Sequence, residues 1–139
     1  MEDDLSYNTK RHIERIKASP FIEPNKQLLI KFIEQKAKEA GGYFDRTTLL
    51  IRIMKEFNDI DLTKLTNEQV KETLERLNNL RWEYSYTSFV AVRQVWVHFL
   101  GFIKKECNLN IDPKAEAKAF TSKQKRRFMT FTRFIRDGN

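Results

Sequence analysis

The sequence predicts an all-α fold: a compact bundle of five to six helices, followed after a short linker by a basic C-terminal helix. Gly and Pro contribute only 4 and 3 of the 139 residues, and so few turn-forming residues favour long helices with short connections. Apolar residues recur at helical spacing in several successive segments. With 40% apolar and 32% charged residues, the chain can bury a core without disulfides or metals.

Two helices are expected in the first third of the chain. Residues 8–18 form a short helix, which Asn8 caps and Ser19-Pro20 ends. A second helix begins near Pro24, a residue suited to the first helical turn, and Gly41-Gly42 ends it. The apolar positions of the second helix predict its buried face: Leu28, Leu29, Phe32, Ile33, Ala37 and Ala40.

The next two helices are predicted from their caps. Asp45 is the expected N-cap of a third helix that runs through Phe57. The buried stripe of this helix is Leu49, Leu50, Ile53, Met54 and Phe57. Thr66 and Gln69 have the spacing of a capping box, so a fourth helix begins there and extends to about Leu80. Its predicted buried residues are Val70, Leu74 and Leu77.

The fifth helix is the longest and the most apolar. Tyr86 or Thr87 caps it, and it extends to about Glu106. A broad apolar arc follows its whole length and predicts the central helix: Phe89, Val92, Trp96, Phe99, Leu100 and Ile103, widened by Val95 and Phe102. Gly101 lies inside this helix, where Gly costs about 1 kcal/mol relative to Ala. We therefore expect another backbone to approach closely at Gly101.

Charge is distributed unevenly along the chain. We expect a helical domain at 1–107, a linker at 108–113 and a basic amphipathic helix within 114–139, opened by a capping box at Thr121 and Gln124. The tail holds eight basic side chains against two carboxylates, so it accounts for +6 of the net charge of +7. A basic balance favours polyanionic partners. Because the rest of the chain is nearly neutral, a nucleic-acid site there has to be a local stripe.

The sequence shows no complete active site. Cys107 is the only cysteine, which excludes an intrachain disulfide and a Cys-based zinc site. His12 and His98 are the only imidazoles, and neither a Gly-rich phosphate loop nor a His-x-x-x-His pair accompanies them. We interpret His98 as a half-buried helix residue in preference to a DNA or partner contact. We therefore expect no catalysis, cofactor, metal or small-molecule ligand.

The order of elements from residue 24 to residue 106 resembles the N-terminal core-binding domain of tyrosine recombinases, the phage-integrase type. A helix with Thr47-Thr48 near its start is followed by a connector from Ile60 to Val70 and a short helix. Tyr86-Thr87-Ser88 then opens a long aromatic helix that ends in Phe99-Leu100-Gly101-Phe102-Ile103. Residues 119–124 stand where such recombinases enter their catalytic domain, with Gln124 in place of the usual acid.

The resemblance implies that the chain binds double-stranded DNA without cutting it, as half of a clamp used in site-specific recombination or integration. The family's catalytic residues are expected downstream of this chain, and His98 is not part of the family's His-x-x-Arg motif. The chain is then either one part of such a recombinase or a stand-alone relative that binds DNA without cutting it. The helices led by Arg46-Thr47-Thr48 and Tyr86-Thr87-Ser88 would approach the major groove and the phosphates. Side chains of Arg, Lys, Thr and Gln suit such contacts.

The candidate DNA-binding residues come from three segments. They are Arg46, Thr48, Arg52 and Lys55 on the third helix, Thr87, Arg93, Gln94 and Lys104 on the fifth, and Lys123, Lys125, Arg126 and Arg127 in the tail. No window approaches about 18 uninterrupted apolar residues, and no secretory signal is recognisable. We therefore expect a cytoplasmic protein without a membrane span, associated with the nucleoid when it is bound to DNA.

A second class of function is a small protein-interaction or adaptor module. The C-terminal helix carries Phe128, Phe131, Phe134 and Ile135 on one side, which suits docking on a partner or homo-oligomerisation. Such association would survive high salt, because apolar burial is little screened. An enzyme with an unrecognised site is the third hypothesis, with the least support.

Overall fold

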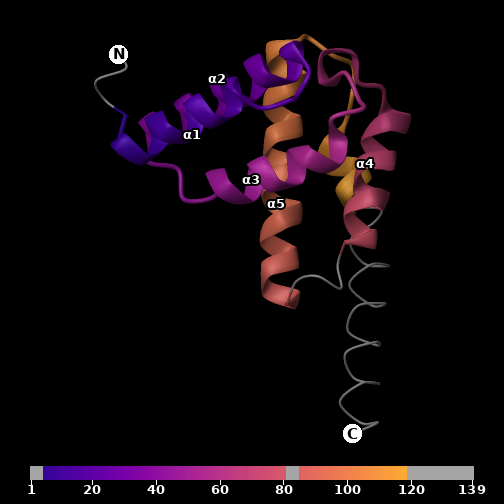
Figure 1. Ribbon diagram of the computed structural model, residues 1–139. Coiled ribbons are helices and arrows are strands. Elements are labelled where there is room, and N and C mark those ends of the chain that lie inside the picture. The colour runs from indigo at the N-terminus through magenta and orange to yellow at the C-terminus, as the bar shows by residue number, and fades with distance from the viewer. Residues whose placement is uncertain (1–4, 81–84, 119–139) are drawn as a thin grey trace, which may run out of the picture.

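The computed structural model describes residues 5–80 and 85–118, and every regular element within these ranges is helical (Figure 1). The elements are α1 (Tyr7–Lys17), α2 (Glu23–Glu39), α3 (Thr47–Met54), η2 (Lys55–Phe57), η3 (Leu62–Lys64), α4 (Asn67–Asn79) and α5 (Tyr86–Glu106), where η marks a 3-10 turn. Residues 113–118 are also helical. The predicted all-α bundle is therefore confirmed.

α5 lies at the centre of the bundle, as its broad apolar arc predicts. In Figure 1, α3 crosses α5 near its middle, α2 crosses it nearer the C-terminal end, and α4 packs beside it. The side chains of the arc are buried: Phe89, Val92, Val95, Trp96, Phe99, Leu100 and Ile103. With these positions occupied by the core, only one stripe of α5 reaches the surface.

Aromatic rings connect α5 to its neighbours. The ring centroid of Trp96 lies 4.7 Å from that of Phe57 and 5.7 Å from that of Phe99. Phe32 of α2 continues this cluster, with its centroid 5.1 Å from Phe99. The indole N–H of Trp96 donates to the Thr73 hydroxyl of α4 at 2.9 Å, so the largest buried side chain leaves no polar atom unpaired.

The predicted buried faces are confirmed with three exceptions. Phe102 of α5, expected to widen the buried arc, is half-buried. Leu49 of α3 is only half-buried, and Ala40 is exposed because α2 has ended and Ala40 occupies its C-cap. The capping box is confirmed: the Thr66 hydroxyl accepts from the Gln69 backbone N–H, and the Gln69 side chain accepts from the Thr66 N–H.

Three of the predicted caps are wrong. Ser6, and not Asn8, caps α1, because the Gly42 carbonyl accepts from both the Ser6 backbone N–H and the Thr9 hydroxyl and fixes this end of the helix. Asp45 does not cap α3; the chain enters α3 through a turn without a side-chain cap. Ser85, and neither Tyr86 nor Thr87, caps α5.

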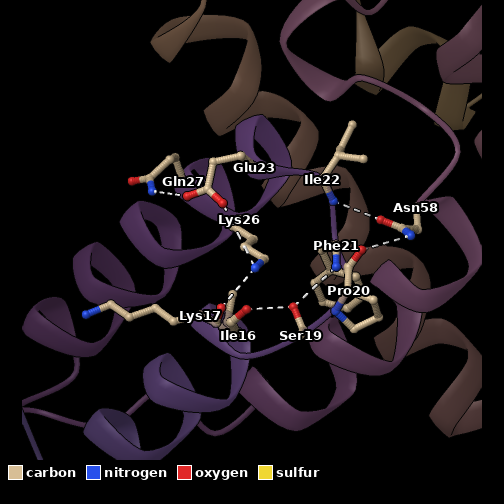
Figure 2. A network of polar contacts seen from close by, with 10 residues as sticks. All are labelled: Ile16, Lys17, Ser19, Pro20, Phe21, Ile22, Glu23, Lys26, Gln27 and Asn58. Carbon is tan, nitrogen blue, oxygen red and sulfur yellow. Dashed lines mark hydrogen bonds and ion pairs between the residues drawn. The ribbon is translucent and has the colours of Figure 1, made fainter.

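The connection between α1 and α2 is fastened to the segment between η2 and η3. Figure 2 shows Asn58 bridging the two, since its side-chain oxygen accepts from the Ile22 N–H at 3.0 Å and its amide donates to the Pro20 carbonyl at 3.4 Å. On the other side of the connection, the Lys26 ammonium donates to the Lys17 carbonyl at 2.9 Å. These polar contacts fix the angle at which α1 leaves α2.

The end of α5 reverses the chain. Asn108 has a left-handed backbone (φ 53°), and the Leu109 N–H donates to the Lys104 carbonyl at 3.0 Å, which is the Schellman arrangement. The chain then returns toward α4, where the Asn67 side chain accepts from the Asp112 N–H at 2.9 Å. Helical structure resumes at residue 113, earlier than predicted; the expected start at Thr121 lies outside the described residues.

Asn25 provides a direct test of this packing. Its fully buried amide donates to the Ile60 carbonyl at 2.7 Å and accepts from the Leu62 N–H at 2.9 Å. Asn25→Ala leaves both backbone groups buried without partners, so we expect the free energy of unfolding to fall by about 2–4 kcal/mol. Urea unfolding followed by circular dichroism measures this loss.

Gln27→Ala is the matched control, because the Gln27 amide donates to the exposed Glu23 side chain on the same helix. Its expected effect is within about 0.5 kcal/mol. Equal losses in the two variants would contradict the role assigned to Asn25.

Candidate nucleic-acid interface

The exposed side of α3 carries the residues predicted for that helix. Thr48, Arg52 and Lys55 are all exposed, and their spacing of four and three residues places them on one helical face. The opposite face of α3 is buried, with Leu50 and Ile53 in the core against α5. Thr48, Arg52 and Lys55 therefore form a polar stripe that half-buried Ile51 interrupts.

Arg46 links the start of α3 to α5. Its guanidinium donates to the Gln94 side-chain oxygen at 3.4 Å. Gln94 is exposed and Arg46 is half-buried, so both are available at the surface of the bundle. The contact brings together two predicted residues from different helices, and these two side-chain types hold phosphates and read base edges.

The other predicted residues of α5 are spread along the helix. Arg93 is half-buried, with its guanidinium carbon 5.9 Å from the centroid of the Phe89 ring, so it packs along the apolar edge of α5. Lys104 is exposed and lies about 15 Å along the axis from Gln94. The side chain of Thr87 and the tail candidates Lys123, Lys125, Arg126 and Arg127 lie outside the described residues.

A groove of about 820 Å³ opens beside the C-terminal half of α5. Gln35 and Lys36 of α2 form one side, and residues 112–114 form another. The exposed stripe of α5 lies between them, with His98 and Gly101 among its lining residues. The Asn67–Asp112 hydrogen bond and the turn at Asn108 hold the 112–114 side in place.

The groove is rich in cations. Its lining lysines are Lys36, Lys104, Lys105 and Lys114. Both lining carboxylates are already engaged: Glu106 accepts from Lys31 at 2.9 Å, and Asp112 accepts from the Ala115 N–H at 3.2 Å. Within the part of the chain that the structure describes, Lys104, Lys105 and Lys114 form no ion pair. With four lysines against two carboxylates, one of them paired with Lys31 outside the lining, the groove carries net positive charge.

His98 lies where the Arg46–Gln94 contact meets this groove. It is exposed, so the prediction of a half-buried residue is wrong. The pKa of His98 lies below its usual value. Partial desolvation is the larger cause, and the positive charges of Lys36, Arg46 and Lys114 add to it. Cations from three parts of the chain thus disfavour protonation of this imidazole.

Sequence reasoning missed most of this groove. His98 follows Gln94 by four residues on the same helix, so helical periodicity could have assigned it to the interface. Lys36 and Lys114 carry no such signal, because only the packing of α2 and the return of the chain after Asn108 bring them beside α5.

Gly101 does not serve the role predicted for it. A Cβ atom added at Gly101 would meet nothing within 4 Å, so no neighbouring backbone requires glycine there. Gly101 instead lies in open space on the α5 side of the groove.

Neither a metal site nor a membrane span emerges from the described ranges. No group of three or more His, Cys, Asp or Glu side chains in 5–80 and 85–118 is arranged to hold a metal ion. None of the helices described there combines the length and apolar character needed to cross a bilayer.

Comparisons of the chain with protein-family models, with curated protein sequences and with solved structures gave no match. The functional assignment therefore rests on the residues of α3, α5 and the groove between α2, α5 and 112–114.

Replacement of Gly101 tests whether its small size serves the fold. Because the added methyl group meets nothing and Ala is the better helix former, we expect Gly101→Ala to stabilise the protein by about 0.5–1 kcal/mol. The midpoint of urea unfolding measures this change. A loss of stability would restore a packing role for Gly101.

Both histidines should make stability depend on pH. The pKa of His12 is lowered by burial and by Arg15 and Arg11, and the pKa of His98 is lowered as described above. The unfolded chain, with an ordinary pKa of about 6.5, then binds more protons than the folded one. Stability is therefore fully present above about pH 6.5 and is lost as the pH falls below it.

Urea unfolding at about pH 7.5 and 5.5 measures this dependence. The control is the double variant that carries both His12→Gln and His98→Gln. We expect the wild type to lose more stability than the variant between these two conditions. An equal or smaller loss in the wild type would contradict the assigned pKa directions.

Proposed function

We propose that this protein binds double-stranded DNA non-covalently through the exposed face of α3 and α5. The observation that carries the proposal is the Arg46–Gln94 hydrogen bond, which joins phosphate-binding and base-reading side chains from two helices on one surface. Thr48 and Arg52 extend this surface along α3, and Lys55, predicted on the same helix, continues it at the first residue of η2. Duplex DNA is the polyanion that such a helical face fits, because an α-helix enters the major groove.

The charge distribution supports this orientation. Carboxylates gather on and beside α4, where Asp59 and Glu72 both pair with Arg76, at 2.8 Å and 2.9 Å. The Arg76 contact also lowers the pKa of Asp59, so this carboxylate stays ionised. α4 carries Glu68, Glu72 and Glu75 against Lys71 and Arg76, so its surface attracts phosphates less than the α3/α5 face and the adjoining groove do.

The biological setting that we propose is site-specific recombination, with this chain as the core-binding part of a tyrosine recombinase. The support is the order of elements noted in the sequence: the Thr47-Thr48 helix, the capping box at Thr66 and the long aromatic helix from Tyr86. Catalytic residues for strand cleavage would then belong to another part of such an enzyme.

Substitutions on the α3/α5 face test the DNA-binding proposal. We expect Arg46→Ala and Arg52→Ala each to weaken binding of a 30-base-pair duplex about 5- to 10-fold, since each removes a cation beside the phosphates. The slope of log affinity against log salt should decrease in magnitude by about 1 for each lost phosphate contact. Fluorescence anisotropy at several salt concentrations measures both quantities.

Lys71→Ala on α4 is the charge-matched control, because Lys71 is exposed and lies outside α3, α5 and the groove. Affinity unchanged in a double Arg46→Ala, Arg52→Ala variant would remove the proposed face. Substituting Lys123, Lys125, Arg126 and Arg127 by Gln separates the tail from this face. If the tail variant lost all DNA binding while the double variant kept wild-type affinity, the DNA-binding site would be in the tail.

A further inference from the structure

We propose that the groove between α2, α5 and residues 112–114 is a phosphate-binding track, which holds the sugar–phosphate backbone of the same duplex beyond the Arg46–Gln94 contact. The inference rests on the proposed DNA binding and adds a second contact region to it. The groove has the volume of a ligand site, about 820 Å³, and three separate elements supply its sides.

Charge complementarity identifies the occupant. Four lysines line the groove, while its two carboxylates are held by Lys31 and by the Ala115 N–H. Lys36 alone among the four has a carboxylate partner in the described ranges, the exposed Glu39 at 3.5 Å, and an exposed pair of this kind is weak. An excess of lysines over carboxylates favours an anionic ligand, and phosphodiester groups supply one charge each.

The groove adjoins the Arg46–Gln94 contact, and this position favours nucleic acid as its ligand. From Gln94 to Lys105 the exposed stripe of α5 runs about 16 Å. His98 lies between the two regions, so a backbone that passes the Arg46–Gln94 contact meets the imidazole before the lysines. One bound strand can therefore contact both regions.

Gly101 supports the same conclusion. Glycine weakens a helix interior, and no neighbouring group in the structure requires it at this position. Its missing side chain leaves room on the α5 side of the groove, where a sugar–phosphate backbone can approach the helix closely.

The histidine gives the track a proton linkage. Lys36 from α2, Arg46 from the start of α3 and Lys114 from the 113–118 helix oppose protonation of His98, and Lys104 and Lys105 lie farther along its own helix. Glu106 and Asp112 also line the groove but are engaged elsewhere. A phosphate placed among these cations would offset their repulsion, so DNA binding would take up a proton at His98 and tighten as the pH falls toward 6.

Two measurements on the full chain test the track. First, the triple variant Lys36→Gln, Lys104→Gln, Lys114→Gln should bind a 30-base-pair duplex with a salt slope reduced in magnitude by about 2 to 3, as expected for lost phosphate contacts. Gly101→Met, which fills the groove with a good helix former, should weaken affinity at least 5-fold at low salt. Lys71→Gln should leave affinity and slope unchanged.

Second, proton NMR titration of the two histidine rings reports the site directly, because the chain has only 2 histidines. Saturating duplex should raise the pKa of His98 and leave that of His12, on α1, unchanged. If the wild type binds DNA and Arg46→Ala weakens it, but the triple variant, Gly101→Met and the His98 titration all match the unperturbed protein, the track is overturned and the α3/α5 site stands. If the wild type binds no duplex at low salt, both proposals fail together.

Discussion

The burial of one broad arc of α5 is the constraint on which the rest of the structure depends. A helix whose apolar residues cover so much of its circumference needs partners on several sides, and α2, α3 and α4 supply them. Trp96 fixes the arrangement, because its ring packs on Phe57 while its indole N–H needs the Thr73 hydroxyl of α4. The same burial decides which residues stay outside. Only the stripe through Gln94, His98 and Lys105 is left for a partner.

That stripe departs from what stability alone would select. A glycine interrupts it although nothing crowds the position, and lysines from separate elements gather around it although their charges repel. Local conflicts of this kind concentrate at functional sites, because selection for binding tolerates a cost in stability. The acidic surface near α4, where Arg76 holds Asp59 and Glu72, has no such conflict. The contrast between the two surfaces favours the α3/α5 side as the face that meets a polyanion.

Local rules of helix formation explain which buried faces and caps could be predicted from the sequence. Helical periodicity placed the buried faces of α2 to α5, and the capping box at Thr66 was recognisable because both of its partners are close in sequence. The caps at Ser6 and Ser85 were missed because neighbouring polar residues offered equivalent choices, and tertiary contacts such as that to Gly42 decided between them. The predicted faces of α3 and α5 meet at Arg46 and Gln94. The lysine-lined groove was not predictable, since it depends on where α2 and the chain after Asn108 come to lie.

A single experiment tests the central claim that the α3/α5 face binds duplex DNA: amide chemical-shift mapping by NMR during titration with a short duplex. The account predicts that the shifts concentrate at residues 46–55 and 94–105 and in the groove around Lys36 and Lys114, with α4 little affected. Shifts confined to residues 119–139, or centred on α4, would contradict it. The first of those outcomes would leave a basic tail as the DNA contact, and the second would exclude the charge complementarity on which the proposal depends.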